Sequence, residues 1–327
     1  MKKIGIVQKA PVFLDKDRTM ESAVIMVEEA ASNGAQLIVF TEAFIPGYPA
    51  WVWRLRPGAD WNTSEALHHR LLNNSVDVEA GDLAPLYAAA KMNNVTIVCG
   101  IEERDGKLSQ STLYNTVVTI GPDGILQNKH RKLMPTNPER MVWGFGDATG
   151  LKVVDTPVGR IGSLLCWENF MPLARYAMYA QGVEIYIAPT YDSGENWLGT
   201  LQHIAREGCC YVVGCGNLMK GSDIPADFPE RETLYPDEDE WVNPGDSVVI
   251  APGGEIVAGP MNKEAGILYH DIDLDKVAIS KRAFDVVGHY SRPDIFQLHI
   301  NNQPQSPALF EQGTGSLNKT PGVRRVK

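Results

Sequence analysis

Three residues that could carry out nucleophilic chemistry follow directly after apolar, strand-like segments. These residues are Glu42, Lys132 and Cys166. Taken singly, each has an ordinary explanation, because glutamates and lysines are mostly solvated and buried cysteines mostly serve packing. Ligands of open α/β sheets collect at the carboxyl ends of strands. We therefore expect the three side chains to meet in one pocket.

Cys166 is the strongest candidate for a nucleophile. An apolar run ends at this residue, and a helical pattern follows it at once. A thiol at such a junction lies near unpaired backbone N–H groups and the positive end of a helix dipole. Both features favour a thiolate over a thiol.

The segments that must position these residues alternate between short apolar strands and helices. Strands are predicted at 4–7, 37–40, 95–100, 161–166, 183–187 and 210–216, and helices at 18–32, 83–92, 172–181 and 197–207. Hairpins are predicted at 113–132 and 247–259, each around a glycine-containing turn. This order indicates an α/β fold with helices packed on a sheet, and the two similar hairpins suggest two such sheets.

Two segments lack this pattern. Residues 223–246 are rich in Pro, Asp and Glu and are predicted to form a surface excursion. Periodicity ends after residue 282, and Pro, Gln, Gly and Ser dominate from residue 301 onward. We expect that tail to be disordered or ordered only against another subunit.

Composition excludes several classes of function. The 327 residues carry a net charge of −10, which argues against a nucleic-acid surface. No apolar stretch is long enough to cross a bilayer, and the N-terminus lacks the apolar region of a signal peptide. The cysteines number five, and the four besides Cys166 lie on apolar, strand-like stretches, which predicts buried, reduced thiols in a cytoplasmic protein.

Two other arrangements of reactive side chains fit the sequence less well. Cys209, Cys210 and Cys215 lack the Cys-x-x-Cys spacing of a structural zinc site, so core packing is the better explanation. A Cys–His pair with one of four histidines was also considered, at positions 203, 270, 289 and 299. None of these lies in a segment that suggests catalysis.

Four blocks resemble the nitrilase family, in order, between about residue 4 and residue 300. They are residues 34–49, which contain Glu42; residues 130–136, followed by Glu139 and Trp143; Cys166-Trp167-Glu168-Asn169; and residues 288–294. One departure is Ser163, where nitrilases more often carry a smaller or amide-bearing residue. We expect it to change packing beneath the nucleophile without abolishing activity.

The resemblance implies a role for each matching residue. It names Cys166 as nucleophile, Glu42 as base, Lys132 as stabiliser and Glu139 as a second carboxylate near the lysine. It implies hydrolysis of a small-molecule nitrile to the carboxylic acid and ammonia, with no metal or organic cofactor. Four aromatic residues are candidates for the substrate pocket: Tyr48, Trp143, Trp167 and Tyr191.

The resemblance also implies an architecture. The family's fold is an α-β-β-α sandwich that pairs into an eight-layered dimer and commonly extends into spirals. We expect residues 4–285 to form this domain and 286–327 to form a C-terminal segment that makes oligomer contacts or is partly disordered.

Three alternatives stay open. An amidase or carbamoylase uses the same triad but typically has an aspartate-bearing block after the cysteine. A cyanide hydratase shares the block found here. The third is a catalytically silent scaffold, which would form no covalent adduct at Cys166.

Overall fold

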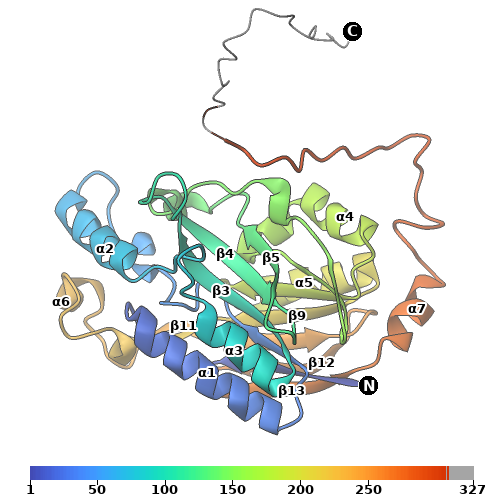
Figure 1. Cartoon of the computed structure of the whole chain (residues 1–327), viewed down its shortest axis with the longest axis horizontal. Coiled ribbons are helices and arrows are strands. Elements are labelled where there is room, and N and C mark those ends of the chain that lie inside the picture. Colours follow the sequence, from blue (N-terminus) through green and yellow to red (C-terminus); the bar gives the residue numbers. More distant parts are fainter. Residues whose placement is uncertain (307, 309–327) are drawn as a thin grey trace, which may run out of the picture.

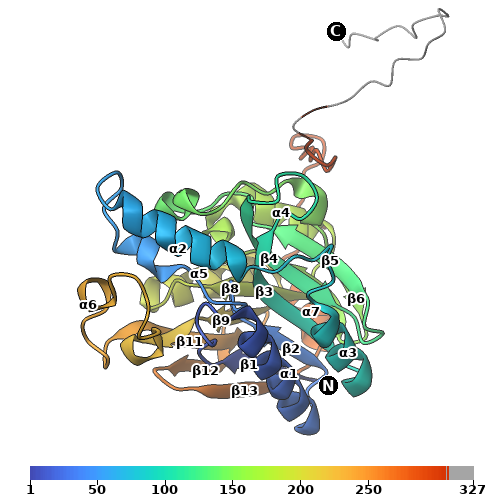
Figure 2. The ribbon, with the colours of Figure 1, turned by 60° about the vertical axis from the view of Figure 1, so that its left-hand side comes forward.

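The computed structural model describes residues 1–306 and 308, and the remainder of the predicted tail lies outside the described residues. Two β-sheets form the centre of the molecule (Figures 1 and 2). The first is six-stranded, in the order β13-β1-β2-β3-β4-β5. The second is seven-stranded, in the order β10-β11-β9-β8-β7-β6, with β12 paired to β11. The prediction of two sheets is therefore confirmed.

The strands of the first sheet are β1 (Lys2–Gln8), β2 (Leu37–Phe40), β3 (Thr96–Arg104), β4 (Leu113–Ile120), β5 (Leu126–Arg131) and β13 (Gly266–Ile272). Those of the second are β6 (Val154–Thr156), β7 (Gly159–Ser163), β8 (Ile185–Thr190), β9 (Tyr211–Gly216), β10 (Leu218–Lys220), β11 (Trp241–Ile250) and β12 (Ile256–Asn262). In each sheet the central strands are parallel and the hairpins lie toward the edges.

The α-helices are α1 (Lys16–Ser32), α2 (Trp61–Asn73), α3 (Ala84–Asn93), α4 (Pro172–Ala180), α5 (Glu195–Gly208), α6 (Arg231–Leu234) and α7 (Asp275–Lys281). Short 3₁₀ helices are η1 (Ala50–Trp53), η2 (Asn137–Met141), η3 (Ala148–Gly150), η4 (Cys166–Phe170) and η5 (Gly221–Asp223). None of the described helices has the length and apolar character needed to cross a membrane.

The layers follow from the alternation of side chains along each strand. In β2, Ile38 and Phe40 pack in one hydrophobic cluster with α1 and α3, which lie side by side in Figure 1. Leu37 and Val39 point to the other face and pack against strands of the second sheet. Because side chains of a strand alternate between faces, a four-residue apolar strand can serve both layers.

A third cluster lies between the second sheet and helices α4 and α5, where Tyr186 and Val212 meet Met178 and Leu201. The layers therefore run helix, sheet, sheet, helix. This confirms the predicted α-β-β-α sandwich.

Two features differ from the sequence-based expectations. The predicted surface excursion at 223–246 is only partly right: residues 223–240 are mostly exposed or half-buried, but Phe228 and Tyr235 are buried in an apolar cluster with Trp51, and β11 begins at Trp241. The helical pattern expected directly after Cys166 is a 3₁₀ helix, η4, whereas α4 begins at Pro172, where the sequence predicts a helix. In the first case a few apolar residues set burial in a segment of mostly polar composition.

Candidate active site

Glu42, Lys132 and Cys166 come from three different strand ends and meet in one buried cluster. The Cys166 sulfur and one carboxylate oxygen each of Glu42 and Glu139 lie within 4.8 Å of one another. The Lys132 ammonium lies 2.8 Å from a carboxylate oxygen of Glu42 and 2.8 Å from one of Glu139. All four side chains are buried.

Glu42 lies in the turn after β2, which packs tightly against β3. A side chain at Gly100 of β3 would place its Cβ 2.2 Å from the carbonyl oxygen of Thr41 and 2.8 Å from the Glu42 Cα, so glycine is needed there. The Glu42 carboxylate accepts hydrogen bonds from the Asn115 amide (2.7 Å) and from the backbone N–H of Tyr191 (2.7 Å). These donors fix the direction of both carboxylate oxygens.

Lys132 follows directly after β5 and is held by its backbone. Its N–H donates to the Asn115 carbonyl (2.8 Å), and its own carbonyl accepts from Gly146 N–H (2.8 Å). Burial alone would lower the pKa of Lys132, but the negative charges of Glu42 and Glu139, and that of Cys166 when its sulfur is ionised, raise it on balance. The side chain is therefore an ammonium throughout the neutral range.

Glu139 holds the ammonium from the other side. It lies in η2, where its carboxylate also accepts from the Thr136 backbone N–H (2.6 Å) and from the Tyr48 hydroxyl (2.6 Å). The Trp53 indole N–H donates in turn to the Tyr48 oxygen (3.0 Å). This chain of hydrogen bonds fixes Glu139, and through it Lys132.

Cys166 occupies a backbone conformation that L-residues rarely adopt, with a φ of 48°. Such residues cluster at functional sites, where the surroundings hold them in place. The Asn169 amide donates to the carbonyls of Leu164 (3.1 Å) and Cys166 (2.7 Å) and so fixes the turn. The Thr190 hydroxyl at the end of β8 donates to the Cys166 sulfur (3.3 Å).

The resting protonation state of Cys166 differs from the sequence-based expectation. Burial raises the pKa of the Cys166 thiol, the negative charge of Glu42 raises it further, and the opposing effects of Lys132 and Thr190 do not overcome this. The prediction that the local junction favours a thiolate is therefore wrong for the free protein. A 3₁₀ helix as short as η4 contributes little dipole, and burial is a larger effect.

The same cluster has the spacing of a cation site. Among the described residues, Glu42, Glu139 and Cys166 form the one group whose ligand atoms lie close enough together to hold a metal ion. The Lys132 ammonium already contacts both carboxylates. The Lys132 ammonium thus supplies the positive charge that balances the two carboxylates.

Glu168 ties the lysine segment to the cysteine turn. Its two oxygens accept from the backbone N–H groups of Leu133 (2.6 Å) and Leu165 (2.7 Å), and both lie 3.1 Å from His130 Nε2. Burial alone would raise the pKa of Glu168, but His130 and the two backbone donors lower it on balance. One carboxylate thus joins the residues after β5 to those after β7.

Replacing Glu168 with glutamine is expected to destabilise the fold by about 2–3 kcal/mol at neutral pH, because an amide N–H₂ would face buried N–H groups. Since the folded pKa lies below the ordinary 4.5, the stabilisation by Glu168 is complete above that value. It is lost as pH falls through the folded pKa. Urea unfolding of both proteins between pH 7 and pH 3 measures the difference.

The matched control is Glu184→Gln, at a half-buried glutamate that accepts from one backbone N–H, that of Arg160. We expect it to cost less than about 1 kcal/mol. A gap between wild type and Glu168→Gln that stays constant down to pH 3 would contradict the assigned role of the Glu168 charge.

A cavity of about 260 Å³ opens onto the Cys166 sulfur. Of the four aromatic residues predicted for the substrate pocket, Tyr48, Trp167 and Tyr191 line this cavity, and Trp143 does not. Trp143 is buried behind the wall, edge-on to the Tyr48 ring, with Lys132 Nζ 5.6 Å from its ring centre. The remaining lining residues are Trp53, Thr136, Glu139, Cys166, Asp192, Ser193, Val242, Asn243 and Pro244.

Four of the twelve residues that line this cavity are aromatic, and they make up its apolar part together with Val242 and Pro244. Tyr48 and Tyr191 stack with ring centres 3.9 Å apart and planes 8° from parallel. Asp192 on the wall accepts from the Trp167 indole N–H (2.7 Å). The cavity suits a small ligand that has an apolar body and a polar group directed at Cys166.

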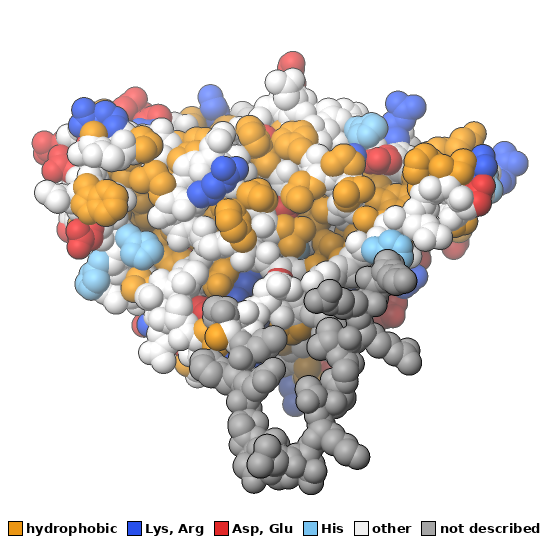
Figure 3. Space-filling view, turned by 90° about the horizontal axis from the view of Figure 1, so that it is seen from above, with side chains coloured by type: hydrophobic (Ala, Val, Ile, Leu, Met, Phe, Trp, Pro, Cys, Tyr) orange, Lys and Arg blue, Asp and Glu red, His pale blue; other side chains and the backbone are white. Residues whose placement is uncertain are grey.

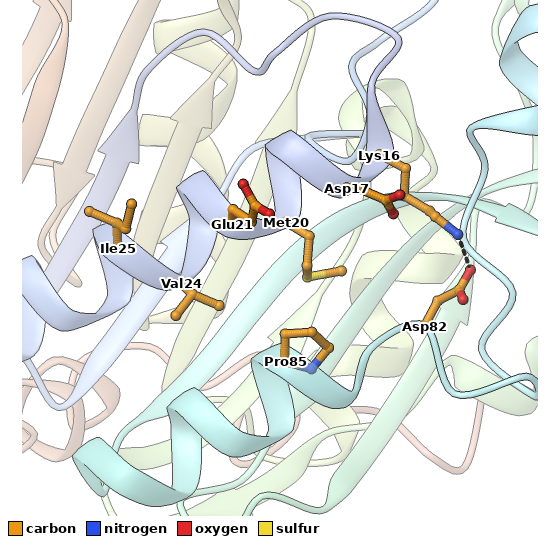
Figure 4. Close-up of a pocket in the computed structure, with 8 residues that line it drawn as sticks. All are labelled: Lys16, Asp17, Met20, Glu21, Val24, Ile25, Asp82 and Pro85. Atoms are coloured by element: carbon orange, nitrogen blue, oxygen red, sulfur yellow. Dashed lines mark hydrogen bonds and ion pairs between the residues drawn. The ribbon is translucent and has the colours of Figure 1, made fainter.

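A second hollow lacks this chemistry. The groove between α1 and α3 has a volume of about 630 Å³ and contains the ion pair between Lys16 and Asp82 (2.7 Å) (Figure 4). It contains no cysteine or histidine. The cavity at Cys166 is likewise lined by no histidine, so the arrangement does not support a Cys–His pair. All five cysteines are free and buried.

Several site residues were missed from the sequence. Asn115 lies within a predicted hairpin strand, and Thr190 lies just beyond the strand predicted at 183–187, at the end of the observed β8. Their signal was weak: each is a polar residue in a segment whose other residues are mostly apolar. Their contacts with Glu42 and Cys166 depend on the pairing of distant strands, which spacing alone does not reveal.

Comparisons with known proteins agree with this geometry. Residues 3–282 match the family described as "Carbon-nitrogen hydrolase". The chain is 41% identical over 319 residues to "Bifunctional nitrilase/nitrile hydratase NIT4A" of Lupinus angustifolius, covering 95% of this chain and 89% of that protein. It is 41% identical over 310 residues to "Nitrilase 2" of Arabidopsis thaliana, covering 93% of this chain and 90% of that protein.

Solved structures show the same fold at lower sequence identity. A carbon-nitrogen hydrolase from Helicobacter pylori G27 has a TM-score of 0.67 at 21% identity, covering 90% of this chain and 96% of that chain. An amidase from Nesterenkonia sp. has a TM-score of 0.60 at 18% identity, covering 85% and 92%. These likenesses support the architecture of the sandwich.

Proposed function

The chain belongs to the carbon-nitrogen hydrolase family, and on that basis we propose that it hydrolyses an organic nitrile to the carboxylic acid and ammonia. The observation that carries this proposal is a buried thiol beside a carboxylate that is paired with an ammonium, at the base of a small cavity. The plant relatives named nitrilases match nearly the whole chain.

In the first step Cys166 acts as the nucleophile. The Glu42 carboxylate takes the thiol proton as the sulfur adds to the nitrile carbon, because a thiolate is strong enough to attack this weak electrophile. One C–N π bond breaks, and the nitrogen takes up the proton that Glu42 accepted from the thiol, which gives a neutral thioimidate and restores the Glu42 carboxylate. Lys132 stabilises the developing negative charge on nitrogen, and one donor of this kind contributes about 3–4 kcal/mol.

In the second step Glu42 activates water. Addition of this water to the thioimidate carbon gives a tetrahedral intermediate. Departure of ammonia, protonated through Glu42, leaves a thioester. A second water cleaves the C–S bond, releases the carboxylic acid and restores the thiol. The sum is one nitrile and two waters converted to one acid and one ammonia.

Partition of the tetrahedral intermediate decides the product. Loss of ammonia leads to the acid, whereas loss of the Cys166 sulfur releases the amide. The lupin relative is named as a bifunctional nitrilase/nitrile hydratase. Amide is therefore a product to be measured here alongside the acid.

The experiment is a product analysis with benzonitrile, an aliphatic nitrile, an arylacetonitrile, cyanide and the matching amides. We expect acid and ammonia from at least one organic nitrile. Turnover of amides without nitriles would indicate an amidase, and formamide from cyanide would indicate a cyanide hydratase. No turnover and no adduct at Cys166 would support a silent scaffold.

We also propose that the protein works as a homodimer or larger spiral. Phe170 and Leu173, at the junction of η4 and α4, are 47% and 67% exposed. Figure 3 shows further hydrophobic side chains gathered on the face seen from above. Sedimentation of the full chain as a monomer at micromolar concentration would contradict this proposal.

A cytoplasmic location is part of the same proposal. All five cysteines are free, as is usual for proteins of a reducing compartment.

A further inference from the structure

Two buried oxygen atoms beside the catalytic cluster have no hydrogen-bond donor among the described residues. They are Oε1 of Glu102 and Oδ1 of Asn115. Glu102 in β3 and Asn115 in β4 are direct partners in the antiparallel register. Side chains of such partners project from the same face of a sheet, about 5 Å apart at Cβ.

The other polar atoms of these two side chains are already engaged. The Asn115 Nδ2 donates to Glu42 (2.7 Å), which fixes the amide with its oxygen directed away from the glutamate. Glu102 Oε2 accepts from the Trp143 indole N–H (2.6 Å). Among the described residues, no lysine, arginine or histidine forms an ion pair with Glu102.

An ionised Glu102 would therefore be a poorly compensated charge. It is fully buried, and the strand register places it on the same face as Asn115, whose amide oxygen also lacks a donor. An unpaired charge and two unsatisfied acceptors are costly in a buried site. A single proton placed between the two oxygens removes all three costs.

We propose that Glu102 is a neutral carboxylic acid whose O–H donates to Asn115 Oδ1, and that it positions the Asn115 amide for Glu42. Burial raises the pKa of Glu102 well above its ordinary value. The charges of Glu42 and Glu139 raise it further, and the opposing effects of Trp143 and Lys132 are smaller. The kinetic consequence of this inference rests on the proposed nitrile hydrolysis; the protonation state does not.

Glu102 thus acts on the reaction through its neighbours. Holding the Asn115 oxygen keeps the amide N–H₂ directed at the Glu42 carboxylate, whereas a turned amide would set two oxygens against each other. On its other side Glu102 holds Trp143, whose ring packs near the Lys132 ammonium. The uncharged Glu102 side chain thus supports Glu42 through Asn115 and Lys132 through Trp143.

Infrared difference spectroscopy of the full-length protein tests the protonation state directly. Subtracting the spectrum of Glu102→Gln from that of wild type at neutral pH is expected to show the C=O stretch of one protonated carboxyl group. A difference spectrum that shows only carboxylate bands would mean that Glu102 is ionised and would overturn the proposal. The same result is expected if a water molecule bridges an ionised Glu102 to Asn115.

Glu103→Gln is the matched control for this spectrum. Glu103 is the next residue of β3, is also buried, and accepts from Lys129 (2.7 Å) and Arg131 (2.7 Å). Those cations lower its pKa on balance against burial. Its replacement should remove carboxylate bands and no protonated carboxyl band.

Kinetics test the positioning role. Glu102→Gln can donate to Asn115 and accept from Trp143, so kcat should stay within about threefold of wild type. Glu102→Met can do neither, and we expect kcat to fall about tenfold or more with a displaced acidic limb of the pH–rate profile. Wild-type kcat and pH profile in Glu102→Met would overturn the role.

The two arms separate this inference from the proposed function. The infrared result needs no turnover, so it stands even if the protein hydrolyses no nitrile. If Glu102→Met does not fold, Glu102→Gln still tests the proposal through its activity and its infrared spectrum. A Glu102 side chain that had to be charged would make Glu102→Gln inactive.

Discussion

Replacing Cys166 with alanine is expected to reduce ammonia release from nitriles by on the order of 10⁴-fold or more, because the covalent route is lost with the sulfur. The fold should survive. The change removes one buried sulfur atom, and alanine tolerates the left-handed backbone at this position no worse than cysteine does. Ammonia release and thermal unfolding of the purified variant measure the two effects.

Cys99→Ala is the control for this variant. Cys99 is also buried and free, but it packs in the cluster between the first sheet and helices α1 and α3. Its removal should lower stability by about 1 kcal/mol and leave kcat unchanged. Near-normal turnover in Cys166→Ala would remove this residue from the mechanism.

Replacing Lys132 with methionine should affect both catalysis and stability. Loss of the ammonium removes the stabilisation of the nitrogen anion, which we expect to cost about 10²–10³-fold in kcat. It also leaves Glu42 and Glu139 buried without their shared cation, and breaking such a buried pair costs about 3–5 kcal/mol. Ammonia release and urea unfolding report these losses separately.

Lys129→Met supplies the comparison, at a lysine of β5, the strand that Lys132 directly follows. Lys129 is partly exposed and pairs with Glu103 on β3, away from the cavity. It should retain wild-type kcat and lose about 1 kcal/mol or less of stability. If the folded Lys132→Met variant turned over nitriles at the wild-type rate, the ammonium would have no part in the chemistry.

Much of the site could be predicted because its residues occupy strand ends. Short apolar strands such as Leu37–Phe40 end abruptly at polar residues, so Glu42 and Cys166 stood out as chemically reactive groups at such ends. The carboxyl ends of parallel strands are where ligand sites form in open α/β sheets, so residues at these ends were expected to meet. The layered fold could be predicted from the same alternation of helices and strands.

The charge states and supporting contacts could not be predicted in this way. The pKa of Cys166 depends on its burial among Glu42, Lys132 and Glu139, which are far apart in sequence and meet only after folding. The pairing of Glu102 with Asn115 depends on the register of β3 and β4. Local sequence carries little information on either.

Intact mass spectrometry of the protein during turnover of a slow nitrile tests the central claim most directly. The account predicts a covalent species localised to Cys166 by peptide mapping and absent from Cys166→Ala: the thioimidate, heavier than the protein by one nitrile, or the thioester, heavier by one nitrile plus one water minus one ammonia. Ammonia release with no adduct at any time, or an adduct that persists in Cys166→Ala, would contradict it.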